Sequence, residues 1–317
     1  MARMVTQEQW AGPFRMATAS VAEASEGVRS ENARSRYHTW HRSTRAGKLG
    51  ATPYLTTAGG DAKSEEESLD SDDLDALMRA GEVYHNLRVP PGCWAVVRVD
   101  GRSFTALTKK HYVHPFDERF HLAMVAAATE LLSTLGGALA ATHSDEISVL
   151  LPRDWISFDR KVEKTISVAA GGASAEFTRH TGHAGAFDGR LWVGATDEQV
   201  VDYYRWRQAD ALRGALNSMA YWTLRDEGKT ERQATAALHR KGVDFKNELL
   251  FQHGINFSKT PLWQRRGTIL HWERHEKIGH NPLTGEDVIA QRRRIRIDSE
   301  PPAGDEYSAL IQRLLAV

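Results

Sequence analysis

The chain of 317 residues is long enough to bury a full hydrophobic core, and its 41 basic and 41 acidic side chains cancel, which excludes an overall basic bias toward nucleic acid. Its single cysteine, Cys93, excludes an internal disulfide and a multi-cysteine zinc site. No apolar run approaches the roughly 18 residues that cross a bilayer, so we expect a soluble, cytoplasmic protein with no membrane contact.

Residues 1–78 are expected to form an N-terminal extension, because their composition differs from that of the remaining chain. Residues 1–60 show no sustained hydrophobic period, and residues 61–75 hold a run of acidic side chains. Such a segment buries too little apolar surface to offset its ordering entropy, which predicts a flexible or only partly helical segment. It is either a solvated extension or an RNA-contacting arm, since basic and aromatic side chains are interleaved over residues 34–45.

The compact part of the chain begins with a strand, a helix and two strands, predicted at residues 94–99, 117–135, 138–142 and 146–151. The first strand ends at Asp100, and the last two strands meet in a turn at Ser144-Asp145. In a split βαβ sheet the first and third strands are antiparallel neighbours. Asp100 and Asp145 are therefore expected to face each other at one edge of the sheet.

Two carboxylates at a strand edge, beside a glycine that lets backbone come close, predict an oxygen cage for Mg²⁺. Paired metal ions about 4 Å apart are the means by which polymerases activate a hydroxyl and stabilise a leaving pyrophosphate. The pattern at Asp100-Gly101 and Asp145 thus indicates nucleotidyl-transfer chemistry.

The later elements complete a βαββαβ unit and extend it. They are a helix at 158–177, a strand at 190–193, a helix at 197–224, a helix after Thr230, and a strand past Thr268 with a hairpin tip at 280–285. Small residues at 169–173 would let a neighbouring element approach the second helix closely. The predicted fold is α+β, a ferredoxin-like antiparallel sheet with packed helices. We expect a catalytic domain at 79–270 and a C-terminal hairpin and helix at 271–317.

Six motifs occur in an order that resembles the tRNA-His guanylyltransferase family over about residues 90–270. They are Asp-Gly-Arg-x-Phe from Asp100, Ser144-Asp145-Glu146, Phe187-Asp188-Gly189-Arg190, Trp206-Arg207-Gln208-Ala209-Asp210, Lys246-Asn247-Glu248 with Leu249-Leu250-Phe251, and Gly254-Ile255-Asn256.

The resemblance implies a palm-like nucleotidyltransferase that adds nucleotides to the 5′ end of tRNA in the 3′-to-5′ direction and assembles as a homotetramer, a dimer of dimers. ATP activates the 5′ phosphate, or a 5′ triphosphate is accepted, and the incoming nucleotide's 3′ hydroxyl then attacks. Eukaryotic members carry His-Ile-Asn-Asn after the Trp-Arg-Gln motif, whereas this chain reads Ala211-Leu212-Arg213-Gly214. That departure resembles the bacterial and archaeal proteins that repair truncated tRNA by copying the opposite strand. Both tRNA-His guanylylation and templated repair stay open.

The resemblance also implies roles for the site residues. Asp100, the Gly101 carbonyl and Asp145 are similar to the ligands of two Mg²⁺ ions, and the third catalytic candidate, Glu146, is either an outer-sphere helper or a strand residue. ATP and GTP are the implied substrates.

The nucleotide-binding candidates are Arg102, Ser103, Phe104, Lys110, His111, Ser144, Arg160, Lys161 and Lys246. Lys246 and Lys110 rank first because they stand in matching motifs, and Arg160 and Lys161 follow because they are expected to open a helix beside the site. Lys109 belongs to the wider basic set, and any of these lysines could instead be merely solvated. Thr105 and His114 depart from a family pattern of His and Lys at these places.

The RNA-binding candidates are Arg207, Asn217, Arg292 and Arg294. Arg207 could instead pair with Asp210 along one helix face, and Trp206 with Tyr203 could serve the core or a subunit interface. Arg292 and Arg294 either touch RNA phosphates or form the solvated face of a hairpin strand paired with Glu286-Asp287.

Two other classes of function compete with this interpretation. A nucleotidyl cyclase or signalling-nucleotide synthase shares the palm core, although the Lys-Asn-Glu and Gly-Ile-Asn motifs argue against it. An inactive RNA-binding relative is disfavoured because both Asp100 and Asp145 are present.

Overall fold

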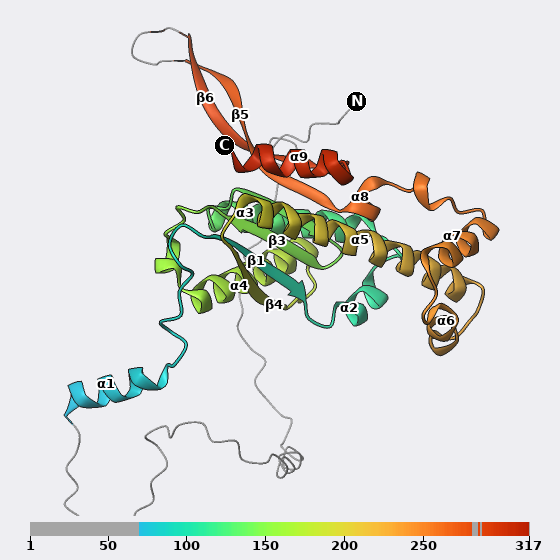
Figure 1. Ribbon diagram of the computed structural model, residues 1–317, viewed down its shortest axis with the longest axis horizontal. Helices are drawn as coiled ribbons and strands as arrows, with labels where there is room; N and C mark the ends of the chain where they lie inside the picture. Colours follow the sequence, from blue (N-terminus) through green and yellow to red (C-terminus); the bar gives the residue numbers. More distant parts are fainter. Residues whose placement is uncertain (1–69, 281–284, 286, 317) are drawn as a thin grey trace, which may run out of the picture. The chain divides into compact units, whose positions relative to one another are not determined.

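The centre of the fold is one six-stranded antiparallel sheet in the order β4-β1-β3-β2-β5-β6 (Figure 1). Its strands are β1 Trp94–Gly101, β2 Leu139–His143, β3 Glu146–Leu151, β4 Phe187–Gly194, β5 Thr268–His280 and β6 Asp287–Asp298. The structure is a computed structural model that describes residues 70–280, 285 and 287–316. The interleaved segment 34–45 and the hairpin tip 281–284 lie outside these residues.

The predicted βαββαβ order is confirmed by β1, α3, β2, β3, α4 and β4, in which α3 is Glu118–Thr134 and α4 is Val162–Thr181. Strand β1 pairs with β3 antiparallel, as the split βαβ topology requires. The fold class is therefore α+β, as predicted.

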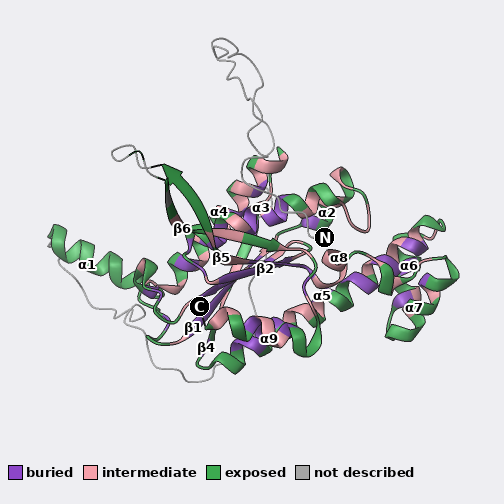
Figure 2. Ribbon diagram, turned by 90° about the horizontal axis from the view of Figure 1, so that it is seen from above, coloured by how far each residue is buried: buried purple, intermediate pink, exposed green. Residues whose placement is uncertain are grey.

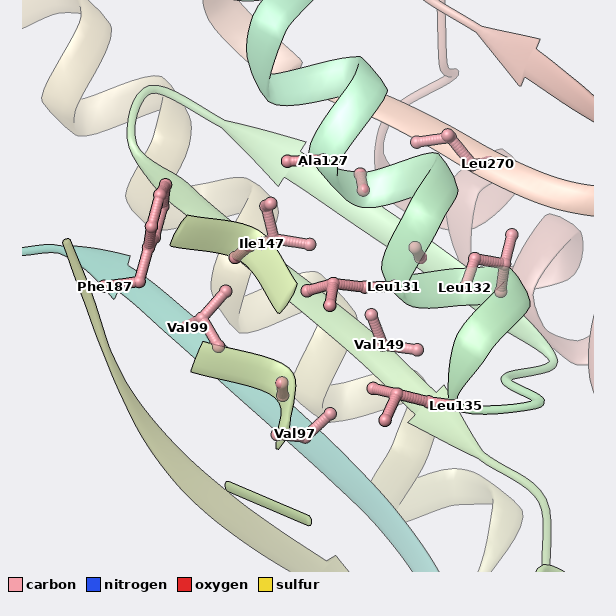
Figure 3. Close-up of a cluster of buried hydrophobic side chains, with 14 of the residues drawn as sticks. Val97, Val99, Ala127, Leu131, Leu132, Leu135, Ile147, Val149, Phe187 and Leu270 are labelled. Carbon is pink, nitrogen blue, oxygen red and sulfur yellow. The ribbon is translucent and has the colours of Figure 1, made fainter. Parts of the chain in front are cut away.

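Alternation along the central strands creates two hydrophobic faces. Val97 and Val99 of β1 point to the core that α3 and α4 cover, whereas Trp94 and Val96 join a second core on the opposite face. Figure 3 shows Val97, Val99, Ile147 and Val149 of the sheet beneath the side chains of α3. Because β1 and β3 are buried on both faces, their ends hold a fixed geometry.

Helices α3 and α4 pack closely because residues 169–173 of α4 are alanine and glycine. A Cβ at Gly172 would lie only 3.1 Å from the Leu131 side chain of α3, so even a methyl group there would force that side chain to shift. The prediction of a close approach at 169–173 is confirmed.

The second face of the sheet is covered by α5, Asp197–Asp226, and α9, Gly304–Leu315. A capping box between Thr196 and Gln199 starts α5. The hydroxyl of Tyr203, further along this helix, forms a 3.1 Å hydrogen bond with the hydroxyl of Ser148 in β3. This bond fixes the long helix across the middle of the sheet and so places its later residues beside the strand ends.

The second predicted helix begins later than expected. Phe158 and Asp159 have φ of 57° and 53°, so residues Ser157–Arg160 form a short 3₁₀ turn, η2, and α4 starts only at Val162. Helix α2, Phe104–His111, was not predicted. The other helices are α1 Ser71–Gly81, α6 Glu231–Leu238, α7 Val243–Gln252, η3 Phe257–Lys259 and α8 Leu262–Arg266.

Leu270 is the last fully buried residue of β5, Trp272 and Ile295 still pack against the core, and the outer residues of the β5–β6 hairpin are mostly exposed (Figure 2). Arg292 lies opposite His275 and Arg294 opposite Glu273, whereas Asp287 pairs with His280. Of the pairing with Glu286-Asp287 offered as one alternative, the part that concerns Asp287 was wrong, because Asp287 belongs to the same strand as the arginines. Glu286 lies outside the described residues. Among the described residues, no helix is both long and apolar enough to span a bilayer.

Candidate active site

Asp100 and Asp145 lie at the same edge of the sheet. Asp100 stands opposite Glu146 in the β1–β3 register, and the Gly101 N–H donates to the Asp145 carbonyl at 3.1 Å. Burial raises the pKa of Asp145, and the charge of Asp100 raises it further, so the two carboxylates interact. The juxtaposition predicted from topology is confirmed.

The backbone around the two aspartates requires particular residues. A Cβ at Gly101 would lie 2.4 Å from the Phe104 ring, so only glycine fits there while that ring stays in place. Ser103 and Ser144 adopt left-handed backbone, with φ of 62° and 53°, at the two points where the chain turns beside the site. Phe104 is only 2% exposed and anchors the first turn in the core.

The donor set at this edge suits Mg²⁺. Burial and the charge of Asp100 raise the pKa of Asp145, so a cation that offsets this negative charge would be stabilised here. The two carboxylates and the Gly101 backbone carbonyl are the hard oxygen ligands that Mg²⁺ prefers. Among the described residues, no group of three or more His, Cys, Asp or Glu side chains could hold a metal. Mg²⁺ is commonly held by one or two carboxylates and completes its shell with water and substrate phosphates.

Glu146 is held by an arginine. Arg207 of α5 forms a two-point ion pair with its carboxylate at 2.7 and 2.6 Å, and Arg98 lies 3.8 Å away. Burial raises the pKa of Glu146, and the charges of Arg207 and Arg98 partly offset that rise. This geometry supports the role of a strand residue that positions the turn, because its oxygens already have partners.

A cavity of about 590 Å³ opens at this edge. Asp100, Ser144, Asp145 and Glu146 border it on the sheet side, and α5 borders it from Arg207 to Trp222. A cavity of this size matches a small-molecule site, and its volume is adequate for a nucleotide.

Two stacked pairs of rings form walls of the cavity. His114 stacks on Trp222 with ring centres 3.8 Å apart, and His121 stacks on Trp263 at 4.3 Å. Burial lowers the pKa of His121 to about 4 and also lowers that of His114, so both rings are neutral at physiological pH. Flat, uncharged walls of this kind suit nucleotide bases.

Sequence reasoning missed three of these four rings and named His114 only as a departure from a pattern. A usable signal was present in the helix predicted at 197–224. Small side chains at Ala211, Ala215 and Ser218, followed by Trp222, recur at intervals of three and four residues, which places a groove along one helix face.

The predicted nucleotide-binding residues near Asp100 and Asp145 divide into those that line the cavity and those that do not. Ser144 and Phe104 border the cavity, although the Phe104 ring packs among Phe120, Phe177 and Phe187. Arg102, Ser103, Lys110 and His111 are not among its lining residues. Lys109, the neighbour of Lys110, does line the cavity, and nucleotide binding by Lys110 stays a prediction.

Arg160 and Lys161 lie at the opposite end of β1. The Arg160 guanidinium donates to the carbonyls of Val89, Pro90, Cys93, Arg153 and Trp155 at 2.6 to 3.0 Å. Every N–H of this buried side chain is used by backbone, so none is left for a phosphate. The helix they precede reaches the site only with its far end, through Phe177, so the assignment of both residues to nucleotide binding was wrong.

The remaining candidates also separate. Asn217 borders the cavity, whereas Lys246 on α7 does not. Arg207 is 15% exposed and also pairs with Asp210 at 2.9 Å, so the predicted helix pairing is confirmed and RNA binding by Arg207 is not supported. Tyr203 is buried as expected, but Trp206 is 49% exposed, with the guanidinium of Arg207 4.4 Å from its ring centre.

Comparisons with known proteins agree with this architecture. Residues 75–195 match the family described as tRNAHis guanylyltransferase, and residues 198–301 match the Thg1 C terminal domain. A probable tRNA(His) guanylyltransferase of Drosophila melanogaster is 34% identical over 192 residues, which cover 57% of this chain and 67% of the relative. One from Dictyostelium discoideum is 34% identical over 56% of this chain and 74% of its own.

Solved structures share the fold. A bacterial tRNA(His) guanylyltransferase (Thg1)-like protein in complex with GTP superposes with a TM-score of 0.60 at 24% identity, covering 77% of this chain and 98% of that protein. The tRNA(His) guanylyltransferase of Saccharomyces cerevisiae gives a TM-score of 0.53 at 23% identity, covering 66% and 95%. At these identities the likeness establishes the fold.

The fold and the family matches define a palm-type nucleotidyltransferase, and the predicted enzyme class is confirmed. The chain belongs to the tRNA(His) guanylyltransferase family. The resemblance seen in the six motifs is thereby confirmed, and membership in this family argues against the nucleotidyl-cyclase alternative.

Proposed function

We propose that this protein adds nucleotides to the 5′ end of tRNA in the 3′-to-5′ direction. The observation that carries the proposal is the pair Asp100 and Asp145 at the edge of a cavity of about 590 Å³, in a member of the tRNA(His) guanylyltransferase family. An inactive RNA-binding relative would have no need of two mutually repelling carboxylates that point to a substrate-sized space.

Asp100, the Gly101 carbonyl and Asp145 would hold Mg²⁺, and bound Mg²⁺ would offset phosphate charge and favour a deprotonated hydroxyl. Ser144 donates to the Asp145 carboxylate at 3.1 Å and so keeps it aimed at the cavity. Glu146 and Arg207 hold the start of β3 against α5. The neutral His114–Trp222 pair offers a stacking wall for a base.

The reaction has two phosphoryl transfers. The 5′ monophosphate of tRNA attacks the α-phosphate of ATP, which forms an adenylylated 5′ end and releases pyrophosphate. The 3′ hydroxyl of the incoming nucleotide then attacks that activated phosphate, a phosphodiester forms, and AMP leaves. A 5′ triphosphate would skip the first transfer and release pyrophosphate in the second.

Templated repair is the version of this activity that we favour. The segment after Gln208 reads Ala-Asp-Ala-Leu-Arg-Gly in place of the polar segment of enzymes that add guanosine without a template. We propose tRNA and nucleoside triphosphates as partners, in a homotetramer, a dimer of dimers. Light scattering on the purified protein would test the tetramer.

A labelled tRNA that lacks its first nucleotide tests the activity. The protein is incubated with Mg²⁺, ATP and each NTP in turn, and products are resolved to single nucleotides. We expect addition only of the nucleotide complementary to the opposite strand. Addition of G against every template base would instead indicate tRNA-His guanylylation, and no extension with any NTP would contradict the proposed function.

A further inference from the structure

Lys109 of α2 stands at the cavity and bonds to a helix outside it. Its side chain borders the same cavity as Asp100 and Asp145, and its Nζ donates to the Glu231 carboxylate of α6 at 2.8 Å. Glu231 itself does not line the cavity. The ion pair therefore pulls the lysine away from the space that a substrate would occupy.

Few of the side chains that line the cavity carry a permanent positive charge. Among the described residues, three permanently cationic side chains line it: Lys109, Arg207 and Arg266. Arg207 is committed to the carboxylates of Glu146 and Asp210. Arg266 donates one of its five N–H groups to the Pro301 carbonyl at 3.0 Å and keeps the others, so it is a second cation that a phosphate could meet. Among the described residues, five carboxylates line the cavity against these three cations: Asp100, Asp117, Asp145, Glu146 and Asp210. A phosphate that enters beside two aspartates therefore needs a cation as well as metal.

The pair of Lys109 with Glu231 is easily exchanged. The two side chains are 35% and 61% exposed, and an ion pair in water is weak. A phosphate carries more negative charge than a carboxylate and offers more acceptor oxygens, so it would compete well for the ammonium group. The committed pairs of Arg207 are 15 to 48% exposed and form a network, which makes that arginine a poor competitor.

We propose that Lys109 binds a phosphate group of the substrate and that Glu231 holds this lysine until the phosphate arrives. The inference rests on the proposed function, which supplies two sources of that phosphate, the triphosphate of an NTP and the 5′ phosphate of tRNA. Glu231 then acts as a positioning residue that competes with substrate.

Binding without turnover tests the exchange on the full chain. Calorimetry measures ATP and GTP binding in Mg²⁺ without RNA, and a filter assay compares tRNA bearing a 5′ phosphate with tRNA bearing a 5′ hydroxyl. We expect Lys109→Gln to weaken one of these phosphate ligands about tenfold, as loss of a charge-assisted hydrogen bond does. Glu231→Gln should tighten the same ligand about two- to threefold, because the competitor is gone.

Two matched variants serve as controls, and circular dichroism checks that all variants fold. Lys229→Gln removes another half-exposed lysine that is paired with a carboxylate, Glu227, away from the cavity. Asp244→Asn neutralises an exposed first-turn carboxylate on α7. Both should bind like the wild type, and Lys109→Arg should restore most of the affinity.

Equal binding by Lys109→Gln and Lys229→Gln for both ligands would overturn the phosphate role. Weaker binding in Glu231→Gln would overturn the competition. These outcomes are separate from the fate of the proposed function. If phosphate binding depends on Lys109 but the wild type extends no tRNA, the proposed function fails and this inference stands. If the wild type extends tRNA but Lys109→Gln binds phosphate as well as the wild type does, the proposed function stands and this inference fails.

Discussion

The charged residues at the two ends of β1 differ in whether the fold supplies them with partners. At one end, the Asp100 carboxylate forms no ion pair with any described residue and borders a cavity beside Asp145. At the other end, Arg160 donates to five backbone carbonyls and is almost fully buried. Both had been assigned to the active site from sequence.

The difference lies in where each charge finds its partner. A buried charge that the fold satisfies completely stabilises the fold, and it has nothing left to offer a ligand. A charge that the fold leaves facing a like charge, at the edge of an open space, costs stability and is poised for a cation or a substrate. Substitutions at the two ends should therefore change different quantities.

Asp100→Asn should have the largest effect on the reaction. Loss of one of two metal-binding carboxylates is expected to lower the rate of nucleotide addition by about 10³-fold, while the unfolding transition stays near that of the wild type. Single-turnover extension of a truncated tRNA measures the rate. A loss below tenfold would remove Asp100 from the centre.

Arg160→Met should have the largest effect on stability. Five carbonyl oxygens lose their donor, and the bonds to Val89 and Trp155 are buried, so the free energy of unfolding should fall by about 3 kcal/mol. Urea unfolding measures this. A loss under about 0.5 kcal/mol would show that water or other donors replace the guanidinium.

Asp145→Asn should stabilise the protein in the absence of Mg²⁺. The raised pKa means that the folded state holds the proton of Asp145 more tightly than the unfolded chain does, so stability falls as pH rises from the ordinary aspartate value through the raised one. At neutral pH the neutral amide should gain up to about 1 kcal/mol.

Mg²⁺ supplies the control for that prediction. Mg²⁺ should raise the melting temperature of the wild type more at neutral pH than at acidic pH, because Asp145 takes up a proton as the pH falls through its raised pKa. Mg²⁺ should not shift the variant. An equal Mg²⁺ shift in both proteins would contradict a metal role for Asp145.

The hairpin arginines should have the smallest effect. Arg294 already pairs with Glu273 at 2.5 Å, which leaves Arg292 with more free charge for RNA. The double variant Arg292→Ala, Arg294→Ala is expected to lower the slope of log affinity for tRNA against log salt by about 1 or less. A fall of about 2 would show that both arginines touch phosphate, and an unchanged slope would remove the hairpin from the binding surface.

Much of the architecture was readable from the sequence. The helix at 117–135 and the strands on either side were predicted from hydrophobic period, and the split βαβ rule then brought Asp100 to Asp145 without any side-chain information. This worked because strand pairing alone fixes where strand ends meet.

The rest depended on contacts that leave no local pattern. The acceptors of Arg160 include carbonyls 67 to 71 residues away, and a backbone carbonyl has no residue type to recognise. Consecutive side chains on a helix point about 100° apart, so Lys109 and Lys110 face different directions. Because helix α2 was not predicted, the sequence did not show which of the two lysines faces the cavity. The η2 turn displaced the start of α4 because Phe158 and Asp159 adopt left-handed backbone that neither residue type suggests.

The most direct test runs Asp145→Asn and Arg160→Met side by side in the tRNA extension assay, with rates expressed per folded molecule and Asp244→Asn as a neutralised control. We expect Asp145→Asn to fold fully but to add no nucleotide, whereas Arg160→Met should be less stable yet work at close to the wild-type rate once folded. Activity in Asp145→Asn, or a folded but inactive Arg160→Met, would contradict the assignment of the reaction to the Asp100 end of β1.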